Sequence, residues 1–498
     1  MKNVELIEVS NYLDRIKKYA YKDIAHIENQ VLNKNPYTSK FILNSLAGKQ
    51  PIKPSKFFLC KQIFIYYAKN FAIFFLYLVC YILFNLFGRK NKINYRKDVY
   101  LIDIYFIVDK IIKDGSFNDS YFIGLYKALR NNNKEYVFLP RLYGIDKNPL
   151  KFFKLLKILN QDKKNLYLFE YELLNLLDIF RILVFILKYP IKQFELLQKK
   201  NSSLDKNFNF ELFNCLPNTT FQAYARYLVG KKLSKIFSGN VIIISWQEFQ
   251  NIEKAFNRAI RESNKKIMIY GCEFVIKMEG YLSLHITDMD VDLLVTPHKT
   301  LMNGKYNYSD STMHNFQYGV SLRYKNIFNY SYSNNGDESP LVLLGYDIKE
   351  SQNLLQTFRH IESLKIKLHP TTNEHQFNFY NKSNWDVTYD NLYNLFKKTN
   401  IVFVPTMSGT ALESVACGIS VIIIASNDIL VVNPLVDYGK GKIWDIVYIE
   451  EEFMEKVNIL LEYRKNNPEE INLISNWYRD NFFIEPTEIN ISKAFELC

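Results

Sequence analysis

The chain has 498 residues, too many for one ordinary hydrophobic core, so its length predicts two large lobes and a smaller appendage. Apolar residues make up 48% of the chain and charged residues 23%, which excludes an intrinsically disordered protein. The formal net charge of +12 suits a phosphorylated substrate or an anionic lipid surface; because no Arg-rich block or nucleic-acid-binding motif occurs, nucleic acid is not an expected partner.

Residues 1–95 are expected to form a helical appendage that carries an apolar segment, 71–87. This segment has a single strongly polar side chain, Asn85, and basic residues on both flanks. Its length is at the lower limit for a membrane span, and the flanks give no charge asymmetry. We expect it to associate with the membrane without spanning it; a spanning helix and a buried helix of a soluble protein are the alternatives.

The compartment is predicted from the cysteines and the N-terminus. Six cysteines lie far apart in the sequence, without a C-x-x-C pair or a disulfide framework, and the first residues are polar and charged. This pattern indicates a reducing compartment. Together with the apolar segment it predicts a peripheral or monotopic protein on the cytoplasmic face of the inner membrane.

Alternating strands and helices begin near residue 96 and predict an N-terminal Rossmann-like lobe over 96–331. Strands are expected at 99–107, 136–139, 166–169, 241–245, 266–270 and 293–296. Strands separated by helices form a parallel sheet with helical cover. A polar segment, 332–340, then breaks the pattern and is expected to be a linker.

The pattern restarts and predicts a second Rossmann-like lobe over 341–470. Its strands are expected at 341–345, 364–368, 401–404 and 420–424. Helical segments follow, and the last helix, within 471–498, is expected to be able to pack back across both lobes. The predicted fold class is therefore α/β, with two Rossmann-like lobes and parallel sheets.

Basic side chains alternate along one predicted strand of the second lobe. Lys365, Lys367 and His369 are separated by apolar residues, so the three should project to one side of the strand. Pro370 ends the strand. A histidine at the carboxyl end of a parallel strand stands where open α/β sheets bind ligands, and a protonated imidazole can donate two hydrogen bonds to a phosphate. The alternative is that Leu-His-Pro only terminates a strand.

A second polar motif follows the next predicted strand. Thr410 and Glu413 have the spacing of a capping box, and Ser408 and Gly409 precede them. The first amides of a helix are free and the helix dipole favours an anion there, so we expect a phosphate to bind at this end. An ordinary capped helix is the alternative. We interpret the two motifs as lying on consecutive strand ends of one sheet.

Taken together, Lys367-Leu-His-Pro370, Ser408-Gly-Thr-Ala-Leu-Glu413 and Cys417-Gly-Ile-Ser-Val-Ile422 resemble the C-terminal lobe of bacterial surface-carbohydrate glycosyltransferases of the GT-B type. Kdo transferases and polysialyltransferases, which use CMP-activated sugars, belong to this group. The resemblance implies that His369, Ser408 and Thr410 bind the phosphate and ribose of the donor nucleotide. Glu413 has the position of a ribose ligand, unless its cap occupies it. The resemblance also implies catalysis without a bound metal or other cofactor.

The first lobe has two candidates for a general base that would deprotonate an acceptor hydroxyl. Trp246-Gln-Glu248 follows a predicted strand and resembles the Trp-x-Glu motif of the same enzymes, which makes Glu248 the first candidate. A role for Glu248 in the first turn of the following helix is the alternative. Glu279 is the second candidate, although Met278 precedes it where polysialyltransferases have an acidic residue.

Three aspartates alternate in Asp288-Met-Asp-Val-Asp292, and on an extended segment they would offer oxygen ligands to Mg²⁺ or Mn²⁺. Because GT-B enzymes generally work without a metal, we expect a solvated strand edge here and no metal. The sequence contains none of the motifs G-x-x-x-x-G-K-[ST], G-x-G-x-x-G, H-E-x-x-H or G-x-S-x-G, so the corresponding ATPase, dinucleotide, zinc-protease and serine-hydrolase classes lack support.

The sequence thus predicts a membrane-associated GT-B glycosyltransferase of lipopolysaccharide, capsule or related surface-carbohydrate synthesis. Its expected partners are a nucleotide-sugar donor, with a CMP-activated sialic-acid-like or Kdo-type acid as the expected sugar, and a lipid-linked or glycan acceptor. One alternative is a polyol-phosphate transferase that uses CDP-glycerol on the same scaffold. Another is a non-catalytic scaffold of a glycan-export complex. Donor, linkage, acceptor and stereochemical course stay open.

Overall fold

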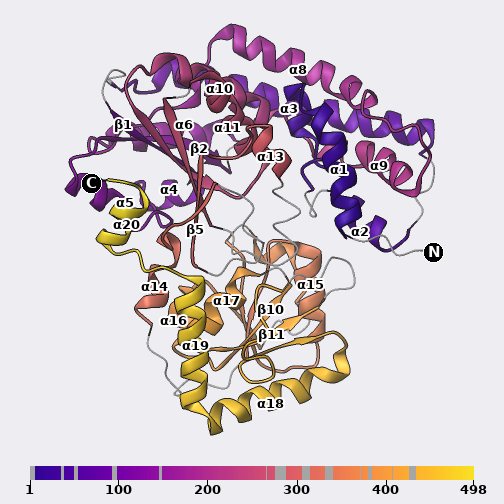
Figure 1. Cartoon of the computed structure of the whole chain (residues 1–498), viewed down its shortest axis with the longest axis vertical. Helices are drawn as coiled ribbons and strands as arrows, with labels where there is room; N and C mark the ends of the chain where they lie inside the picture. Colours follow the sequence, from indigo (N-terminus) through magenta and orange to yellow (C-terminus); the bar gives the residue numbers. More distant parts are fainter. Residues whose placement is uncertain are drawn as a thin grey trace.

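The computed structural model has two α/β lobes, one above the other in Figure 1. The structure describes residues 6–34, 39–49, 54–91, 93, 98–144, 148–264, 266–274, 288–305, 315–330, 340–370, 372–379, 384–406, 408–425 and 433–497. Each lobe contains a six-stranded parallel sheet with helices around it, which confirms the predicted fold class. The predicted linker at 332–340 lies outside the described residues except for Pro340.

The sheet of the first lobe has the strand order β2-β1-β3-β4-β5-β6. Its strands are β1 (Val99–Ile107), β2 (Tyr136–Tyr143), β3 (Val241–Gln247), β4 (Ile267–Glu273), β5 (Lys299–Met302) and β6 (Phe316–Tyr318). The chain passes from β1 to β2 on one side and then returns to the other side of β1 with β3. This reversal makes the carboxyl ends of β1 and β3 a topological switch point, where open α/β sheets bind ligands.

The first sheet is covered by many helices, and one pair packs unusually closely. These helices are α4 (Val108–Asp114), α5 (Leu125–Asn131), α6 (Pro149–Gln161), α7 (Glu170–Leu173), α8 (Leu176–Phe194), α9 (Ser203–Asn214), α10 (Gln222–Ile236), α11 (Asn251–Ser263) and α13 (Asp288–Asp292). A Cβ on Gly230 of α10 would lie 2.7 Å from the Cβ of Ala259 on α11, so only glycine permits this approach. Helix α11 is therefore held firmly against its neighbour.

The sheet of the second lobe has the order β12-β11-β10-β7-β8-β9. Its strands are β7 (Leu341–Leu343), β8 (Leu364–Lys367), β9 (Trp385–Thr388), β10 (Ile401–Pro405), β11 (Ser420–Ile424) and β12 (Trp444–Val447). Its helices are α15 (Ile348–Thr357), α16 (Leu392–Phe396), α17 (Gly409–Ala416), α18 (Phe453–Asn466) and α19 (Pro468–Phe482). The switch point of this lobe lies between β7 and β10.

Two expected strands of the first lobe differ from the structure. Residues 166–169 contribute only an isolated bridge between Tyr167 and Phe138. No strand forms at 293–296, because α13 precedes it, Leu294 adopts a left-handed φ of 60°, and the amide of Val295 bonds to the carbonyl of Asp290 at 3.1 Å. The strand starts later, at β5. Strands β6, β9 and β12, of only three or four residues each, were not predicted.

The N-terminal helices pack on the first lobe. They are α1 (Leu6–Ala20), the 3₁₀ turn η1 (Ile24–Glu28), α2 (Phe41–Leu46) and α3 (Lys56–Phe87). Side chains of α1 and of β1, such as Leu13 and Leu101, belong to one buried apolar core. Helix α3 extends 15 residues before the predicted apolar segment, and it is the single described helix that is long and apolar enough to cross a membrane.

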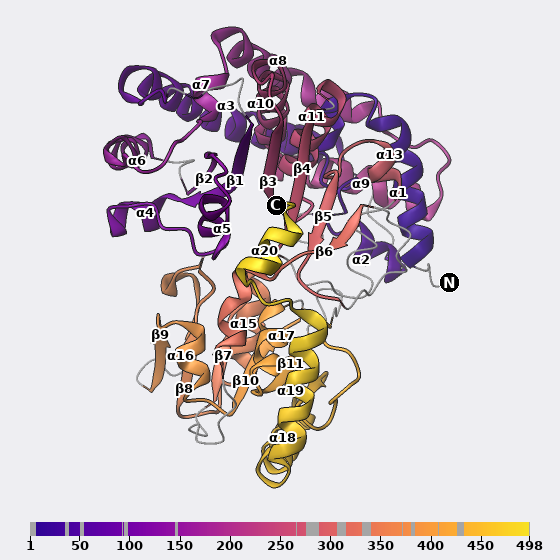
Figure 2. The ribbon, with the colours of Figure 1, turned by 60° about the vertical axis from the view of Figure 1, so that its left-hand side comes forward.

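The chain crosses between the lobes more than once. Segment Leu322–Tyr324 and α14 (Lys325–Phe328) precede the second lobe, and α20 (Glu488–Ala494) follows it. Figures 1 and 2 show α20 back against the first lobe, where Asn131 of α5 donates to Glu488 at 2.6 Å. The amide of Ser321 also donates to the carbonyl of Ile484 at 2.9 Å. These contacts hold the two segments that connect the lobes next to each other.

Candidate active site at the junction of the lobes

Glu248 lies just after the end of β3, at the switch point of the first sheet. Helix α11 begins only at Asn251, and its N-cap is Gln250. Glu253 completes the capping box and accepts hydrogen bonds from the amides of Glu248 (2.7 Å) and Gln250 (3.1 Å). The cap is therefore made by Glu253, which leaves the side chain of Glu248 outside the helix.

The backbone beside Glu248 is strained. Phe249 has a left-handed φ of 61°, a conformation that a bulky side chain rarely adopts, and its ring is buried. Gln250 donates to the carboxylate of Glu248 at 3.0 Å. A strained backbone conformation persists only where the surrounding structure holds it in place, and such conformations are concentrated at functional sites. The turn fixes the direction in which Glu248 leaves the sheet.

A buried ionic network supports this turn from below. Arg141 on β2 donates to Asp103 on β1 (2.8 Å through Nε), to Glu253 (2.9 Å) and to Ser245 on β3 (2.7 Å). Arg226 on α10 donates to the same Asp103 at 2.8 Å. Burial alone raises the pKa of Asp103, but the two guanidinium groups hold it below its ordinary value. The network ties the three neighbouring strands β2, β1 and β3 to the start of α11.

Burial raises the pKa of Glu248, and Arg323 opposes this shift. Burial likewise raises the pKa of Glu253 to about 7, with Arg141 opposing it. A carboxylate with a raised pKa in a fixed position is suited to accept a proton near neutral pH. Glu248 has this character, and Gln250 donates to its carboxylate.

In the second lobe, the two predicted phosphate motifs flank β7. His369 follows β8, and Ser408 follows β10, but β7 lies between these strands. The prediction that the motifs occupy neighbouring strand ends is therefore wrong. The reason is the chain reversal: β8 is added on one side of β7 and β10 on the other, which places both motifs at the switch point.

His369 is neutral in this environment. Burial lowers its pKa to about 4, and the charge of Arg323 adds to this shift. Its ring meets that of Tyr346 edge to face, with centroids 5.8 Å apart. The expected doubly protonated imidazole is thus not the state of the free protein at neutral pH, although a bound phosphate would favour protonation.

The alternation predicted along β8 is present. Leu364 and Ile366 are buried, whereas Lys365 and Lys367 are partly exposed. The ammonium group of Lys367 donates to the carbonyl of Asp390 at 2.5 Å, just beyond the end of β9. Lys367 therefore holds the β8 and β9 ends together in the free protein.

Helix α17 begins two residues earlier than a capping box at Thr410 requires. Its N-cap is Ser408, whose side chain makes no bond to the helix backbone, so the predicted capping box is wrong. The hydroxyl oxygens of Ser408 and Thr410 lie 2.5 Å apart. Gly409 is the first helical residue, and the first amides of an α-helix have no acceptor within the helix. Two hydroxyl groups and these amides gather at one helix end.

Glu413 does not cap the helix, and its side chain is buried below this helix end. It is 6% exposed, and the hydroxyl of Tyr393 donates to its carboxylate at 2.8 Å. Burial raises the pKa of Glu413, whereas Arg323 lowers it. A hydrogen bond to Tyr393 was not foreseeable from sequence, because Tyr393 lies 20 residues away on α16.

Arg323 brings the two lobes into one site. Its charge acts on Glu248 of the first lobe and on His369 and Glu413 of the second. Its guanidinium carbon lies 5.6 Å from the ring centre of Tyr121 in the first lobe. The sequence analysis missed Arg323 because it stands in a short 3₁₀ turn, Leu322–Tyr324, without a motif. Only its position just before the predicted linker hinted at a role between the lobes.

Two further candidates have different outcomes. Glu279 lies outside the described residues. Asp290 is not on a strand edge but on α13, buried, with the ammonium groups of Lys17 and Lys254 at 3.1 Å and 3.6 Å. The prediction of a solvent-exposed strand edge is therefore wrong at Asp290. Within the described ranges, no group of three His, Cys, Asp or Glu residues is arranged to hold a metal ion.

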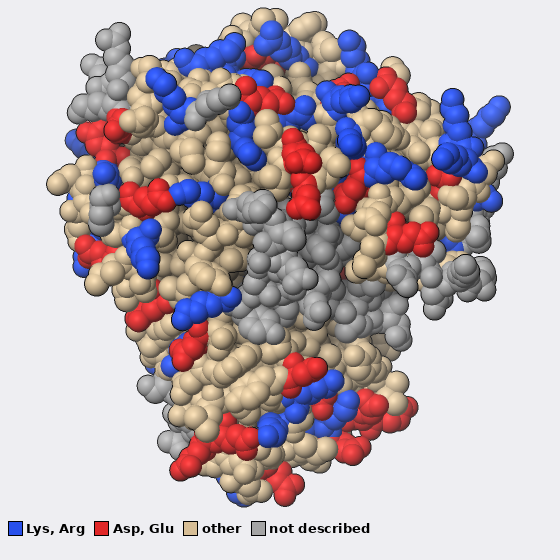
Figure 3. Space-filling view, viewed as in Figure 1, with Lys and Arg blue, Asp and Glu red and all other residues tan. Residues whose placement is uncertain are grey.

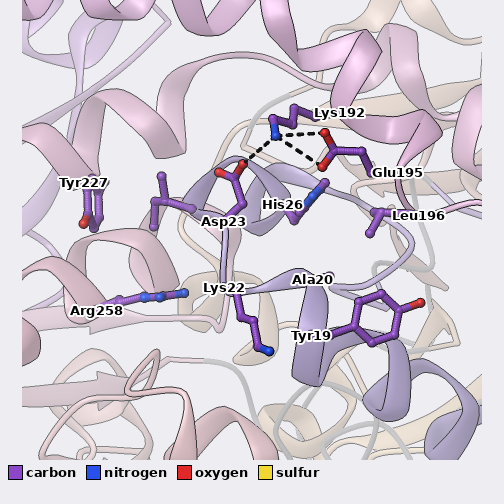
Figure 4. A pocket seen from close by; sticks show the side chains of 11 residues that line it. Tyr19, Ala20, Lys22, Asp23, His26, Lys192, Glu195, Leu196, Tyr227 and Arg258 are labelled. Atoms are coloured by element: carbon purple, nitrogen blue, oxygen red, sulfur yellow. Dashed lines mark hydrogen bonds and ion pairs between the residues drawn. The ribbon is translucent and has the colours of Figure 1, made fainter.

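A separate cavity of about 630 Å³ lies on the first lobe (Figure 4). Lys192 on α8 contacts Asp23 at 3.3 Å and Glu195 at 2.9 Å in its wall. His26 and Arg258 also line it. None of the predicted site residues is in this wall, and its central charges neutralise one another, so the candidate site remains the lobe junction.

No protein-family model and no curated protein matches the sequence. Several solved structures resemble it at low identity. MurG of Acinetobacter baumannii has 9% identity and a TM-score of 0.43, over 81% of this chain and 100% of that one. The Methanocaldococcus jannaschii UDP-GlcNAc 2-epimerase, in complex with UDP-GlcNAc and UDP, has 11% identity and a TM-score of 0.44, over 80% and 100%.

A third similar structure is the glycotransferase of kitacinnamycin. It has 8% identity and a TM-score of 0.41, over 80% of this chain and 99% of that one. All three TM-scores are below 0.5. The function of this chain must therefore be inferred from its own residues.

Proposed function

We propose that the chain is a metal-independent glycosyltransferase that moves a CMP-activated, sialic-acid-like or Kdo-type sugar to a lipid-linked or surface glycan. The proposal rests on one observation. The charge of the same arginine acts on a partly buried carboxylate of one lobe and at the helix end of the other lobe that is suited to bind a phosphate. Glu248 supplies the carboxylate, α17 the helix end, and Arg323 the shared charge.

Glu248 acts as the general base. It takes the proton from the acceptor hydroxyl while the acceptor oxygen forms a bond to the anomeric carbon of the sugar. The bond from that carbon to the phosphate oxygen breaks, and CMP leaves with the electron pair. The strained turn at Phe249 and the capping interactions of Glu253 keep the base in position.

The second lobe stabilises the departing phosphate. Ser408 and Thr410 donate from their hydroxyl groups, the first amides of α17 add the helix dipole, and His369 donates one N–H. Arg323 adds a positive charge from the junction. Glu413 accepts a hydrogen bond from the ribose hydroxyls, in place of or beside that from Tyr393.

The enzyme works at the cytoplasmic face of the inner membrane, where lipid-linked acceptors of lipopolysaccharide or capsule synthesis are made. Helix α3 supports this location through its length and apolar composition. The net charge of +12 favours an anionic membrane surface.

The product mass tests the proposal. Purified protein is incubated with CMP-activated acidic sugars, or separately with CDP-glycerol, and a membrane extract that contains lipid-linked acceptors. We expect acceptors to gain the mass of one sugar without phosphate, and the Glu248→Gln protein to form this product about 10²- to 10⁴-fold more slowly. A gain of glycerol phosphate from CDP-glycerol, with no sugar transfer, would contradict the proposal and identify a polyol-phosphate transferase.

A further inference from the structure

Helix α3 lies along the first lobe and is attached to it over its whole length. One face is buried, including Tyr66, Phe74 and Phe84. The side-chain amide of Asn70 donates to the carbonyl of Thr219 at 3.0 Å. Near the C-terminal end of the helix, the side chain of Asn160 bonds to the carbonyl of Phe87 at 2.7 Å. A helix held in this way cannot cross a bilayer unless it leaves the lobe.

The opposite face of α3 is apolar and exposed. Six exposed apolar residues lie on this face, namely Phe57 (79%), Phe64 (73%), Phe75 (62%), Val79 (40%), Ile82 (47%) and Leu86 (68%), and Ile65 (37%) and Phe87 (50%) are exposed beside it. The six are spaced by 7, 11, 4, 3 and 4 residues, the spacing of one helix face. Six large apolar groups along one face are more than the scattered exposure of an ordinary soluble surface.

Helix α8 continues this apolar surface. The hydroxyl of Tyr67 on α3 donates to the carbonyl of Leu187 on α8 at 2.9 Å, and the rings of Tyr66 and Tyr189 stack with centroids 5.5 Å apart. Its exposed apolar residues are Leu176 (70%), Leu177 (55%), Phe180 (57%), Leu187 (46%), Ile191 (64%) and Phe194 (45%). Figures 1 and 2 both show α8 at the end of the first lobe away from the second lobe.

Basic residues surround this surface. The described stretch 54–91 contains no acidic residue and carries Lys56, Lys61, Lys69, Arg89 and Lys90. Helix α8 adds Lys188, whereas its Arg181 is paired with Asp178 of the helix cap and its Lys192 with Asp23 and Glu195. Figure 3 shows Lys and Arg side chains across the upper end of the first lobe. The charge complements an anionic lipid surface.

We infer that α3 and α8 together form a docking face that lies in the plane of one leaflet of an anionic bilayer, with neither helix spanning it. The exposed side chains of both helices enter the acyl boundary, and the surrounding Lys and Arg contact lipid headgroups. The inference deepens the proposed membrane location by adding α8 and by fixing the orientation of α3. The catalytic proposal is independent of it.

Flotation of the full-length protein with lipid vesicles tests the docking face. We expect binding to vesicles of phosphatidylethanolamine and phosphatidylglycerol, and at least tenfold weaker partition to phosphatidylcholine vesicles. The α8 variant Phe180→Ser/Ile191→Ser should reduce partition at least tenfold. The control Leu473→Ser/Ile489→Ser changes side chains that are 64% and 79% exposed elsewhere, and should bind as the wild type does.

Each contrary result overturns part of the inference. Unchanged binding of the α8 variant would remove α8 from the docking face, and equal binding to both vesicle types would remove the role of lipid charge. A stable dimer in solution that the α8 variant abolishes would show that a second copy covers the face. CMP binding measured on the same variants distinguishes these failures from a failure of the enzyme proposal.

Cys60 tests the in-plane arrangement. Among the described cysteines Cys60 is the exposed one, and it lies near the N-terminal end of α3. In spheroplasts of expressing cells, a membrane-impermeant maleimide should leave Cys60 unmodified, and cell lysis should permit its modification. Modification before lysis would place this end of α3 across the membrane and contradict the inference.

Discussion

The switch points of the two sheets are built from opposite chemistry. In the first lobe, Asp103, Arg141, Arg226 and Glu253 form a buried ionic network in which the charges are paired. In the second lobe the corresponding place has hydroxyl groups, a helix end and the neutral His369. A paired network holds a base rigidly, whereas a helix end with hydroxyl groups and free amides offers hydrogen-bond donors to an anion. The difference assigns the base to one lobe and the phosphate to the other.

The largest effect is expected from removing the base. Glu248→Gln should lower kcat by about 10²- to 10⁴-fold, because general bases contribute rate enhancements of this size. Binding of CMP should not change, since the second lobe holds the nucleotide. Initial rates and a thermal-shift titration with CMP measure the two effects. Glu451→Gln, at an exposed position of the second lobe, is the matched control; weakened CMP binding by Glu248→Gln would show that the lobes do not divide the task.

The ionic network should matter for folding. Arg141→Met leaves Asp103 and Glu253 buried without their main cation, and breaking such a pair costs about 3 to 5 kcal/mol. Urea denaturation should show this loss in the free energy of unfolding. A stability within about 1 kcal/mol of the wild type would mean that Arg226 alone compensates the carboxylates.

Much of the fold was predictable from sequence, because long apolar strands such as Val99–Ile107 and Ile401–Pro405 have a strong periodic signal. Short strands such as Trp385–Thr388 depend on pairing with a neighbour and have little signal of their own. Strand order was also missed: sequence gives the succession of β7, β8 and β10, but long-range packing decides that β7 lies in the middle.

The candidate site was predictable only in part, for similar reasons. His369, Ser408 and Glu248 follow strands directly, so their positions at strand ends could be inferred. Arg323 has no local signal, because its importance comes from residues of both lobes that surround it in space. The role of Glu413 was misjudged because a capping box with Thr410 as N-cap was expected, whereas the N-cap of this helix is Ser408, two residues earlier.

Glu350 should make stability depend on pH. It is buried at the second switch point and accepts a bond from Thr406 at 2.6 Å. Burial raises its pKa to about 7, so the folded protein binds this proton more tightly than the unfolded chain. The resulting stabilisation is complete below about pH 4.5 and is lost as the pH rises to about 7.

Glu350→Gln should therefore be more stable than the wild type at pH 8, by about 2 to 3 kcal/mol, and equal to it at pH 4.5. Denaturation curves at both values provide the measurement. A variant that is less stable at pH 8 would show that the charged carboxylate is stabilised by its surroundings.

Ser408→Ala should weaken donor binding. Loss of one hydrogen bond to a charged phosphate costs about 1.5 to 3 kcal/mol, which raises the KM for the donor about tenfold to a hundredfold. Ser202→Ala is a matched control, because Ser202 caps α9 through its side chain, far from the junction. An equal rise in KM for both variants would attribute the effect to general destabilisation.

Arg323→Gln should change the pH profile of kcat/KM. Arg323 opposes the rise in the pKa of Glu248, so its removal should shift the acid limb of the profile to higher pH. The direction follows because the acidic limb reports protonation of the base. If the acid limb does not move, Arg323 does not influence the pKa of Glu248 and has only a structural role.

Calorimetric titration of CMP tests the division of labour most directly. The wild type and Glu248→Gln should bind CMP with the same affinity, and the double variant Ser408→Ala/Thr410→Ala should bind it at least tenfold more weakly. Binding of UDP or GDP without CMP, or equal CMP affinity in all three proteins, would contradict the assignment of the donor phosphate to the second lobe.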